Sequence, residues 1–348
     1  MIAHRAAQEV PVSARGRRGH RWRGVAWLGL WLVGGCGHGL LAGAAAEGAD
    51  TAPGTAAMAG AAPFELRTSL LEADRIIDTG GGADRPAPLH DPPFGDADSG
   101  HYMGFDERVL GLLNAGVAKA YPLRILVHHG IVHDAIGGKR MLVVHDPHSG
   151  LAAAFSGMLD GQVARYGHSG LVYDGSPLLY DGASRSLWSP LLGRGVAGRH
   201  SGRRMPRVAV VETTWWQWVE AYPQTRVLAA PQGSGIDYRV DPYAAYRVDA
   251  TLAHPVRHRD DRYHPKEPVI GVEHEGRFKA YPFTELHDVG QRVHDTFAGL
   301  DLEIEFSYPE QRAVLSERGG RPVNQVRAYW FAWHAAHPDT EVFVGATR

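Results

Sequence analysis

Histidine is concentrated in one short stretch of this chain, and an aspartate lies inside that stretch. Imidazole binds transition metals and transfers protons near neutral pH, so such clustering has few purely structural explanations. We therefore predict a metal site or a proton-transfer site here. The clustered residues are His128, His129, His133, His145, Asp146 and His148.

A helix followed by a strand and a loop would bring several of these side chains together. Residues 123–133 have the apolar spacing of a helix with a proline at its first turn, so His129 and His133 would share one face. The other candidates follow a buried strand predicted for residues 141–144. Zinc, copper or iron would suit this set, with Asp146 as an oxygen ligand or as a partner of a ligand. The predicted metal ligands are His129, His133, His145, Asp146, His148 and His168.

A plainer reading of the histidines stays open. A histidine on a helix is more often hydrogen-bonded or solvated than bound to a metal. The segment His129-Gly-Ile-Val-His133 has the spacing of the His-Glu-x-x-His zinc protease motif but lacks its glutamate. No nucleophile elbow, Walker loop or dinucleotide glycine motif occurs in the sequence. No catalytic residue is therefore assigned.

Charge along the chain argues against nucleic acid as a partner. The net charge is -2, and an arginine-rich N-terminal stretch leaves the rest of the chain acidic. Phosphate binding needs a basic surface, and no stripe of lysine and arginine appears downstream. Asp241 and Lys266 are expected to be loop and surface charges.

The N-terminus has the pattern of an export signal, in which basic residues precede the apolar run 25–33 and small residues follow. Val-Gly-Gly-Cys36 resembles a bacterial lipobox, which would make Cys36 a lipid-modified membrane anchor. Cleavage after the alanines at 44–46 is the alternative. We predict a signal peptide at 1–35, an Ala/Gly-rich flexible tether at 36–63, and a periplasmic or membrane-anchored lipoprotein. Cys36 is the only cysteine, so the chain forms no intramolecular disulfide.

Two motifs occur twice, and they predict the architecture. Lys-Ala-Tyr-Pro appears at 119–122 and again at 279–282, and a Trp-rich segment at 215–228 matches 330–343. The tryptophans repeat at helical spacing, so core packing is the expected role. The fold class we predict is α+β, with mostly antiparallel strands, short helices and two internally related halves. The predicted bounds are 64–348 for the domain, with halves of about 105–230 and 265–345.

Several motifs in order resemble one bacterial protein family, DUF3179, which has no established function. They are Lys119-Ala-Tyr-Pro-Leu-Arg-Ile-Leu126, Ser169-Gly-Leu-Val-Tyr173, Leu179-Tyr-Asp181, Ser186-Leu-Trp-Ser189 and Pro265-Lys-Glu267. The resemblance implies a Cys-Pro-x-Cys-Gly motif where this chain has Asp146-Pro-His-Ser-Gly150. Asp146 and Ser149 cannot perform the thiol chemistry of two cysteines. Either a sulfur site was rebuilt with nitrogen and oxygen ligands, or the scaffold is a degenerate copy.

Three functions from different classes follow. The first is an exported cell-envelope protein with a His/Asp metal site, redox-active if the metal is copper or iron. The second is a metal-free lipoprotein that binds a small ligand or a partner between its halves. The third is a zinc-dependent hydrolase in which His129, His145 and His148 hold the metal and Asp146 acts as base. The sequence sets neither the metal, the substrate nor the oligomeric state.

Overall fold

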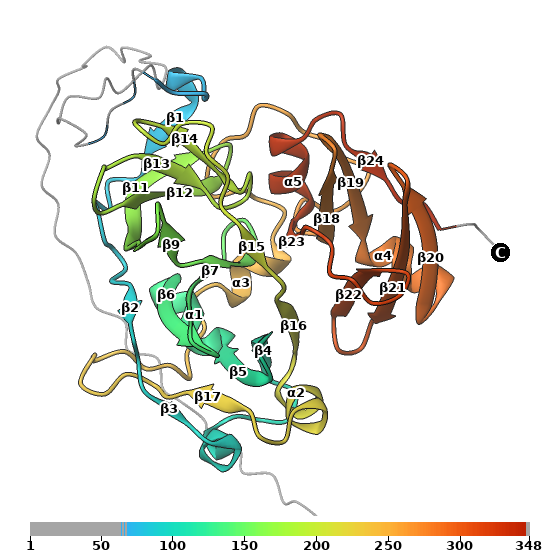
Figure 1. Cartoon of the computed structure of the whole chain (residues 1–348). Helices are drawn as coiled ribbons and strands as arrows, with labels where there is room; N and C mark the ends of the chain where they lie inside the picture. The colour runs from blue at the N-terminus through green and yellow to red at the C-terminus, as the bar shows by residue number, and fades with distance from the viewer. Residues whose placement is uncertain (1–63, 65, 67, 346–348) are drawn as a thin grey trace, which may run out of the picture. The chain divides into compact units, whose positions relative to one another are not determined.

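Strands dominate the computed structural model, which describes residues 64, 66 and 68–345 (Figure 1). Of the described residues, 41% lie in strands and 15% in helices. The α+β fold class predicted from the sequence is therefore wrong, and the protein is mostly β. The physical reason is that the α-helices of this region have at most seven residues. Helices this short depend on packing against neighbouring strands and form no layer of their own.

The first series of elements runs between residues 108 and 228. It consists of β4 (Arg108–Asn114), β5 (Val117–Pro122), α1 (Leu123–His129), β6 (Ile131–Ile136), β7 (Lys139–Asp146), β16 (Val211–Thr214), α2 (Trp215–Ala221) and β17 (Arg226–Leu228). β4 pairs with β5, and β6 pairs with β7, both antiparallel, with α1 between the two hairpins. β16 returns to pair with β4, and β17 lies parallel to β5.

The second series repeats this order near the C-terminus, with one more strand, β22 (Arg312–Glu317), after the second hairpin. It consists of β18 (Pro268–His274), β19 (Arg277–Pro282), α4 (Phe283–Val289), β20 (Arg292–Phe297), β21 (Leu300–Ser307), β22 (Arg312–Glu317), β23 (Gln325–Tyr329), α5 (Trp330–Ala336) and β24 (Glu341–Val342). The hairpins β18–β19 and β20–β21 flank α4. β23 returns to β18, and β24 lies parallel to β19.

The two series pack their tryptophans in the same way. A Cβ atom at Gly111 would lie 2.3 Å from the ring of Trp218, and a Cβ atom at Gly271 would lie 2.2 Å from the ring of Trp333. Both positions therefore need glycine because the indole rests directly on the strand. Each indole N–H donates to a threonine a few residues on, which satisfies the buried donor. Core packing by these tryptophans, as predicted, is confirmed, whereas Trp216 is exposed.

A buried ion pair is also present in both series. Lys119 Nζ donates to both oxygens of Asp134, at 2.9 and 2.8 Å, and Tyr121 donates to Oδ2 of the same carboxylate at 2.6 Å. The second series repeats the arrangement with Lys279, Tyr281 and Asp295. Lysine and tyrosine of the Lys-Ala-Tyr-Pro motif therefore hold the hairpin that follows the helix.

Residues between β7 and β16 form a further group of strands. They are β8 (Leu151–Ser156), β9 (Met158–Leu159), β10 (Gln162–Val163), β11 (Tyr166–Tyr173), β12 (Ser176–Asp181), β13 (Leu187–Ser189), β14 (Arg194–Ala197) and β15 (Arg207–Val208). A hairpin turn at Asp174-Gly175, with φ of 46° and 74°, joins β11 to β12. Together with β1 (Ile76–Asp78), the strands β11 to β14 form a five-stranded sheet.

A nine-stranded sheet joins the two series. Its order is β2 (Leu89–His90), β6, β7, β8, β23, β18, β19 and β24, with β15 beside β8. The join is the pairing of β8 with β23, where Arg327 lies opposite Ala152. The remaining elements are η1 (Ala73–Arg75), β3 (Phe94–Gly95), η2 (Ala97–Tyr102) and α3 (Ala244–Val248). Figure 1 follows the chain from β1 in blue to β24 in red.

Candidate functional site

The helix that carries His129 is shorter than predicted. α1 ends at His129 because Gly130 has a φ of 70°, and Ile131 begins a strand paired with β7. A Cβ atom at position 130 would lie 2.5 Å from the ring of His168, so glycine is required there. The prediction that His129 and His133 share one helix face is therefore wrong. Glycine and the β-branched pair after it end the helix.

His129 and His133 lie in separate surroundings. Both ring nitrogens of His129, and Nε2 of His133, contact oxygen atoms of the protein. His129 Nδ1 is 3.0 Å from the carbonyl oxygen of Ala87, and its Nε2 is 2.8 Å from the hydroxyl of Tyr238. His133 Nε2 is 2.8 Å from the carbonyl oxygen of Tyr166. Burial lowers the pKa of both, that of His133 to about 4. Both rings are therefore neutral structural groups at pH 7.

The other four predicted ligands line one cavity of about 330 Å³. Within it, His145 Nδ1 is 2.9 Å from the carbonyl oxygen of Leu151, and His168 Nε2 is 2.9 Å from that of His129. The residues that this cavity brings together are His145, Asp146, His148 and His168.

Asp146 and Ser149 form a closed turn at the end of β7. The carboxylate accepts hydrogen bonds from the backbone N–H and the hydroxyl of Ser149, and Oδ1 lies 3.7 Å from His148 Nδ1. Burial acts to raise the pKa of Asp146, but the neighbouring His148 and Ser149 outweigh burial and lower it. The carboxylate therefore contacts Ser149 and His148 within its own loop.

The structure does not bring the six predicted ligands together as one metal site. Among the described residues, no three or more histidine, cysteine, aspartate or glutamate side chains are arranged to hold a metal ion. A ligating histidine needs one ring nitrogen free for the metal, and His129 uses both for protein contacts. The predicted lipidation site, Cys36, lies outside the described residues.

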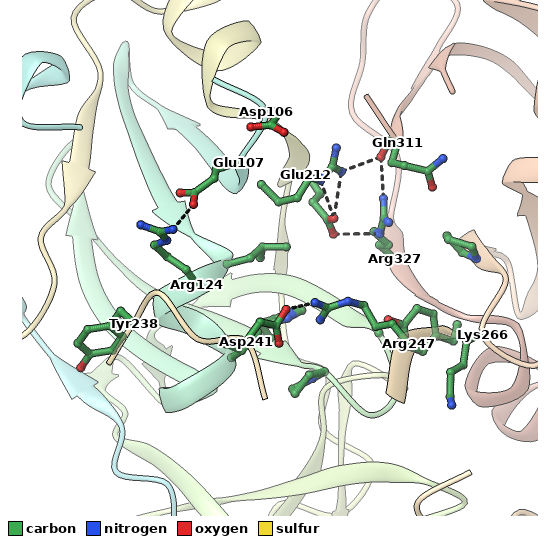
Figure 2. A pocket seen from close by; sticks show the side chains of 18 of the residues that line it. Asp106, Glu107, Arg124, Glu212, Tyr238, Asp241, Arg247, Lys266, Gln311 and Arg327 are labelled. Carbon is green, nitrogen blue, oxygen red and sulfur yellow. Dashed lines mark hydrogen bonds and ion pairs between the residues drawn. The ribbon is translucent and has the colours of Figure 1, made fainter. Parts of the chain in front are cut away.

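A larger, charged cleft lies between the two series. The metal-free hypothesis predicted ligand binding between the halves, but the charged lining of this cleft was not predicted. Its volume is about 600 Å³, and Figure 2 shows the charged side chains around it. The lining residues come from β4, α1, β16, the region before β18, and β23. His145 and Pro147 line both this cleft and the histidine cavity, so the two spaces are neighbours.

Glu212 is the central carboxylate of the cleft. Its Oε1 lies 3.0 Å from Arg108 Nη2 and its Oε2 lies 2.9 Å from Arg327 Nε. Both arginines also donate to the carbonyl oxygen of Gln311, as the dashed lines in Figure 2 mark. Burial acts to raise the pKa of Glu212, but Arg327 and Arg108 outweigh burial and lower it. This ion-pair network joins β4 and β16 of the first series to β23 of the second.

The opposite wall of the cleft holds groups with unused hydrogen-bonding capacity. Arg124 pairs with Glu107, yet Arg124 Nε and Glu107 Oε2 are buried without a hydrogen-bond partner among the described residues. Arg247 pairs with Asp241 and is about one-third exposed. Unpaired buried polar atoms are uncommon in native proteins and often mark a place where a ligand or water binds.

Lys266 also lines the cleft, contrary to the prediction of a surface charge. It is 4% exposed, and its ammonium donates to the carbonyl oxygens of Tyr246 at 2.5 Å, Thr251 at 2.7 Å and Asp249. Its charge is solvated by the backbone and has no carboxylate partner among the described residues. The segment 246–251 therefore folds around this lysine.

Cations outnumber carboxylates in the cleft. The cationic residues are Arg108, Arg124, Arg239, Arg247, Lys266 and Arg327, and the carboxylates are Asp106, Glu107, Glu212 and Asp241. Apolar residues such as Leu123 and Tyr329 complete the lining. One of these cations, Arg239, pairs with Asp237 outside the lining, so the excess of positive charge rests on Lys266. A concave site with such an excess and several convergent polar groups suits a small anionic solute.

The fold and the cleft together define a mostly-β protein whose two series enclose a charged ligand-sized cavity. The chain belongs to the family described as "Protein of unknown function (DUF3179)", whose model matches residues 86–321. The family resemblance inferred from the sequence motifs is thereby confirmed. Neither a curated protein nor a solved structure matches the chain.

Proposed function

We propose that this protein is an exported binding protein of the cell envelope that holds a small anionic solute in its charged cleft. The observation that carries the proposal is the cleft of about 600 Å³ with its surplus of cationic side chains. The unpartnered Arg124 Nε and Glu107 Oε2 support it, because a ligand with an acceptor and a donor would satisfy both.

The position of the cleft adds to this proposal. Arg247 and Lys266 lie in the connection between β17 and β18, which links the two series. Glu212 contacts Arg327 where the two series meet. A solute bound there would contact both series at once. Ligand sites often occur at such junctions because facing surfaces supply concavity and convergent polar groups.

Export and lipid anchoring rest on the sequence alone. The signal-like segment and Cys36 precede the described residues, and in the described part no helix is long and apolar enough to cross a membrane. We expect the full-length wild type to incorporate a labelled fatty acid and a Cys36→Ala variant not to, because the thiol of Cys36 is where the lipid would attach. Incorporation by neither protein, or equally by both, would contradict lipidation at Cys36.

The metal hypotheses receive less support from the site. His129 uses both ring nitrogens for protein contacts, and His133 lies away from the cavity that His145 and His148 line. A redox metal protein and a zinc hydrolase stay predictions that elemental analysis can test. Near-stoichiometric metal that disappears in a His145→Ala/His148→Ala double variant would favour them over a metal-free binding protein.

Native mass spectrometry of the full-length protein tests the binding proposal. We expect a non-covalent small-molecule mass on the wild type that is lost under denaturing conditions and in an Arg247→Gln variant. Arg257→Gln is the matched control, since Arg257 also pairs with one carboxylate and is half-exposed but does not line the cleft. A mass that Arg247→Gln retains would place the ligand elsewhere and contradict the proposed site.

A further inference from the structure

A second cavity lies away from the cleft, beside β15 and the loop before β23. Its volume is about 420 Å³. Three arginines, Arg194, Arg204 and Arg207, line it, and the only carboxylate among its lining residues is Glu273. Glu273 lies 3.7 Å from Arg204, whose side chain is 81% exposed. The other two arginines take part in no ion pair within the described residues.

Arg207 is held in place with a donor left over. Its Nη2 donates to the carbonyl oxygen of Leu191 at 2.6 Å, and its guanidinium lies 5.3 Å from the centre of the Phe155 ring. Its Nη1 is buried and has no hydrogen-bond partner among the described residues. The protein therefore fixes the guanidinium but leaves one of its nitrogens without an acceptor.

Burying the Arg207 guanidinium without a carboxylate partner costs free energy, and its positive charge acts on His337. Burial lowers the pKa of Arg207 to about 10. The pKa of His337 is lowered to about 3, mainly by burial and then by the positive charges of Arg194 and Arg207. Buried charges in proteins are normally paired or hydrogen-bonded, because removal from water costs several kcal/mol. Glu273 is the only carboxylate in the cavity lining and offsets part of this charge, so the three arginines leave the region with an excess of positive charge.

We propose that this cavity binds an oxyanion, a phosphate or carboxylate group of a small solute, with Arg207 Nη1 as a principal donor. Arg194 and Arg204 flank the anion from the same cavity wall. Guanidinium groups match the planar geometry of carboxylate and phosphate oxygens better than ammonium groups do. This site is separate from the charged cleft and does not depend on the function proposed for the cleft.

Thermal unfolding of the full-length protein with and without inorganic phosphate, at constant ionic strength, tests the site. We expect phosphate to raise the Tm of the wild type, because a ligand that binds only the folded state stabilises it. Arg207→Met should lose at least tenfold in phosphate affinity and show no rise. Without phosphate, this variant should be at least as stable as the wild type, since it removes an unpaired buried charge.

Two further variants serve as a control and as a second test of phosphate binding. Arg203→Met is the matched control, because Arg203 is a neighbouring arginine that pairs with Asp160 and does not line the cavity. It should keep the full phosphate effect. Arg194→Gln should weaken the effect and provides the test if Arg207→Met does not fold.

The bound oxyanion can belong to a free solute or to a lipid headgroup. Short-chain phosphatidylglycerol, used as a second probe beside phosphate, distinguishes these two sources. A Tm rise with phosphate indicates a free oxyanion. A rise only with short-chain phosphatidylglycerol, absent in Arg207→Met, assigns the site to a headgroup phosphate. No rise with either probe, or equal rises in Arg207→Met and Arg203→Met, would overturn the proposal.

Discussion

Glu212 is almost fully buried between Arg108 and Arg327. Glu212→Gln keeps the shape of the side chain but leaves two arginines without their counter-charge. Breaking a buried ion pair from one side costs about 3–5 kcal/mol. We therefore expect the free energy of unfolding, measured in urea at pH 7, to fall by about that amount.

A surface carboxylate provides the comparison for Glu212. Glu305 also lies near two arginines, Arg292 and Arg312, but its side chain is 49% exposed. Exposed ion pairs are worth about 0–1 kcal/mol, so Glu305→Gln should be nearly neutral. Equal losses in the two variants would mean that the Glu212 network does not hold the two series together.

The same network gives a pH dependence with a definite sign. The folded-state pKa of Glu212 is lower than its ordinary value of 4.5. Its stabilising contribution is therefore present above pH 4.5 and is lost as the pH falls below that value. The acid branch of the stability curve should be shallower in Glu212→Gln than in the wild type.

His133 contributes a separate pH dependence at milder acidity. Burial lowers its pKa from 6.5 to about 4, so the unfolded chain binds its proton more readily between these values. Stability is then complete above pH 6.5 and is lost as the pH falls toward 4. Between pH 7 and 4.5, this one group should cost roughly 2 kcal/mol, from 1.36 kcal/mol per pKa unit.

Urea unfolding at the two pH values measures the contribution of His133. His133→Gln places an amide where Nε2 contacts the Tyr166 carbonyl but cannot bind the proton. Its stability should fall less between pH 7 and 4.5 than that of the wild type. His287→Gln, at an exposed ring, should behave as the wild type does. If His133→Gln keeps the full acid loss, the linkage assigned to His133 is wrong.

At the scale of elements, two strand glycines support the tryptophan helices. Gly111→Ala and Gly271→Ala would each place a methyl group against an indole ring, at 2.3 and 2.2 Å before relaxation. Overpacking a core costs about 1–3 kcal/mol. Both variants should show lower urea midpoints by comparable amounts. Gly81→Ala, whose added Cβ meets nothing closer than 3.4 Å, should change stability little.

Local patterns in the sequence predicted individual elements better than the fold class. The Lys-Ala-Tyr-Pro motif and the Trp-rich helices are encoded by neighbouring residues, and the structure contains them. The predicted helix over 123–133 failed because the apolar spacing continues through Gly130, where the backbone turns into a strand. Strand pairing, both in hairpins and between segments far apart in the sequence, makes the molecule mostly β.

At the scale of the whole molecule, ligand binding between the halves was one hypothesis, but the residues that line the cleft could not be predicted because they lie far apart in the chain. Arg108 and Arg327 meet on Glu212 only when β4, β16 and β23 are assembled. Nothing in the local sequence around Lys266 indicates that it is buried. We predicted a site at the histidines instead, because they are close in sequence. The structure places them in separate surroundings.

The measurement that tests the central claim most directly is thermal unfolding of the full-length protein against a panel of small monocarboxylates, dicarboxylates and phosphate esters. An Arg207→Met background excludes the second cavity. We predict that at least one solute class raises the Tm by several degrees, and that Arg247→Gln abolishes the rise while Arg257→Gln preserves it. A panel without any shift, or a shift that Arg247→Gln retains in full, would contradict the assignment of the cleft as the binding site.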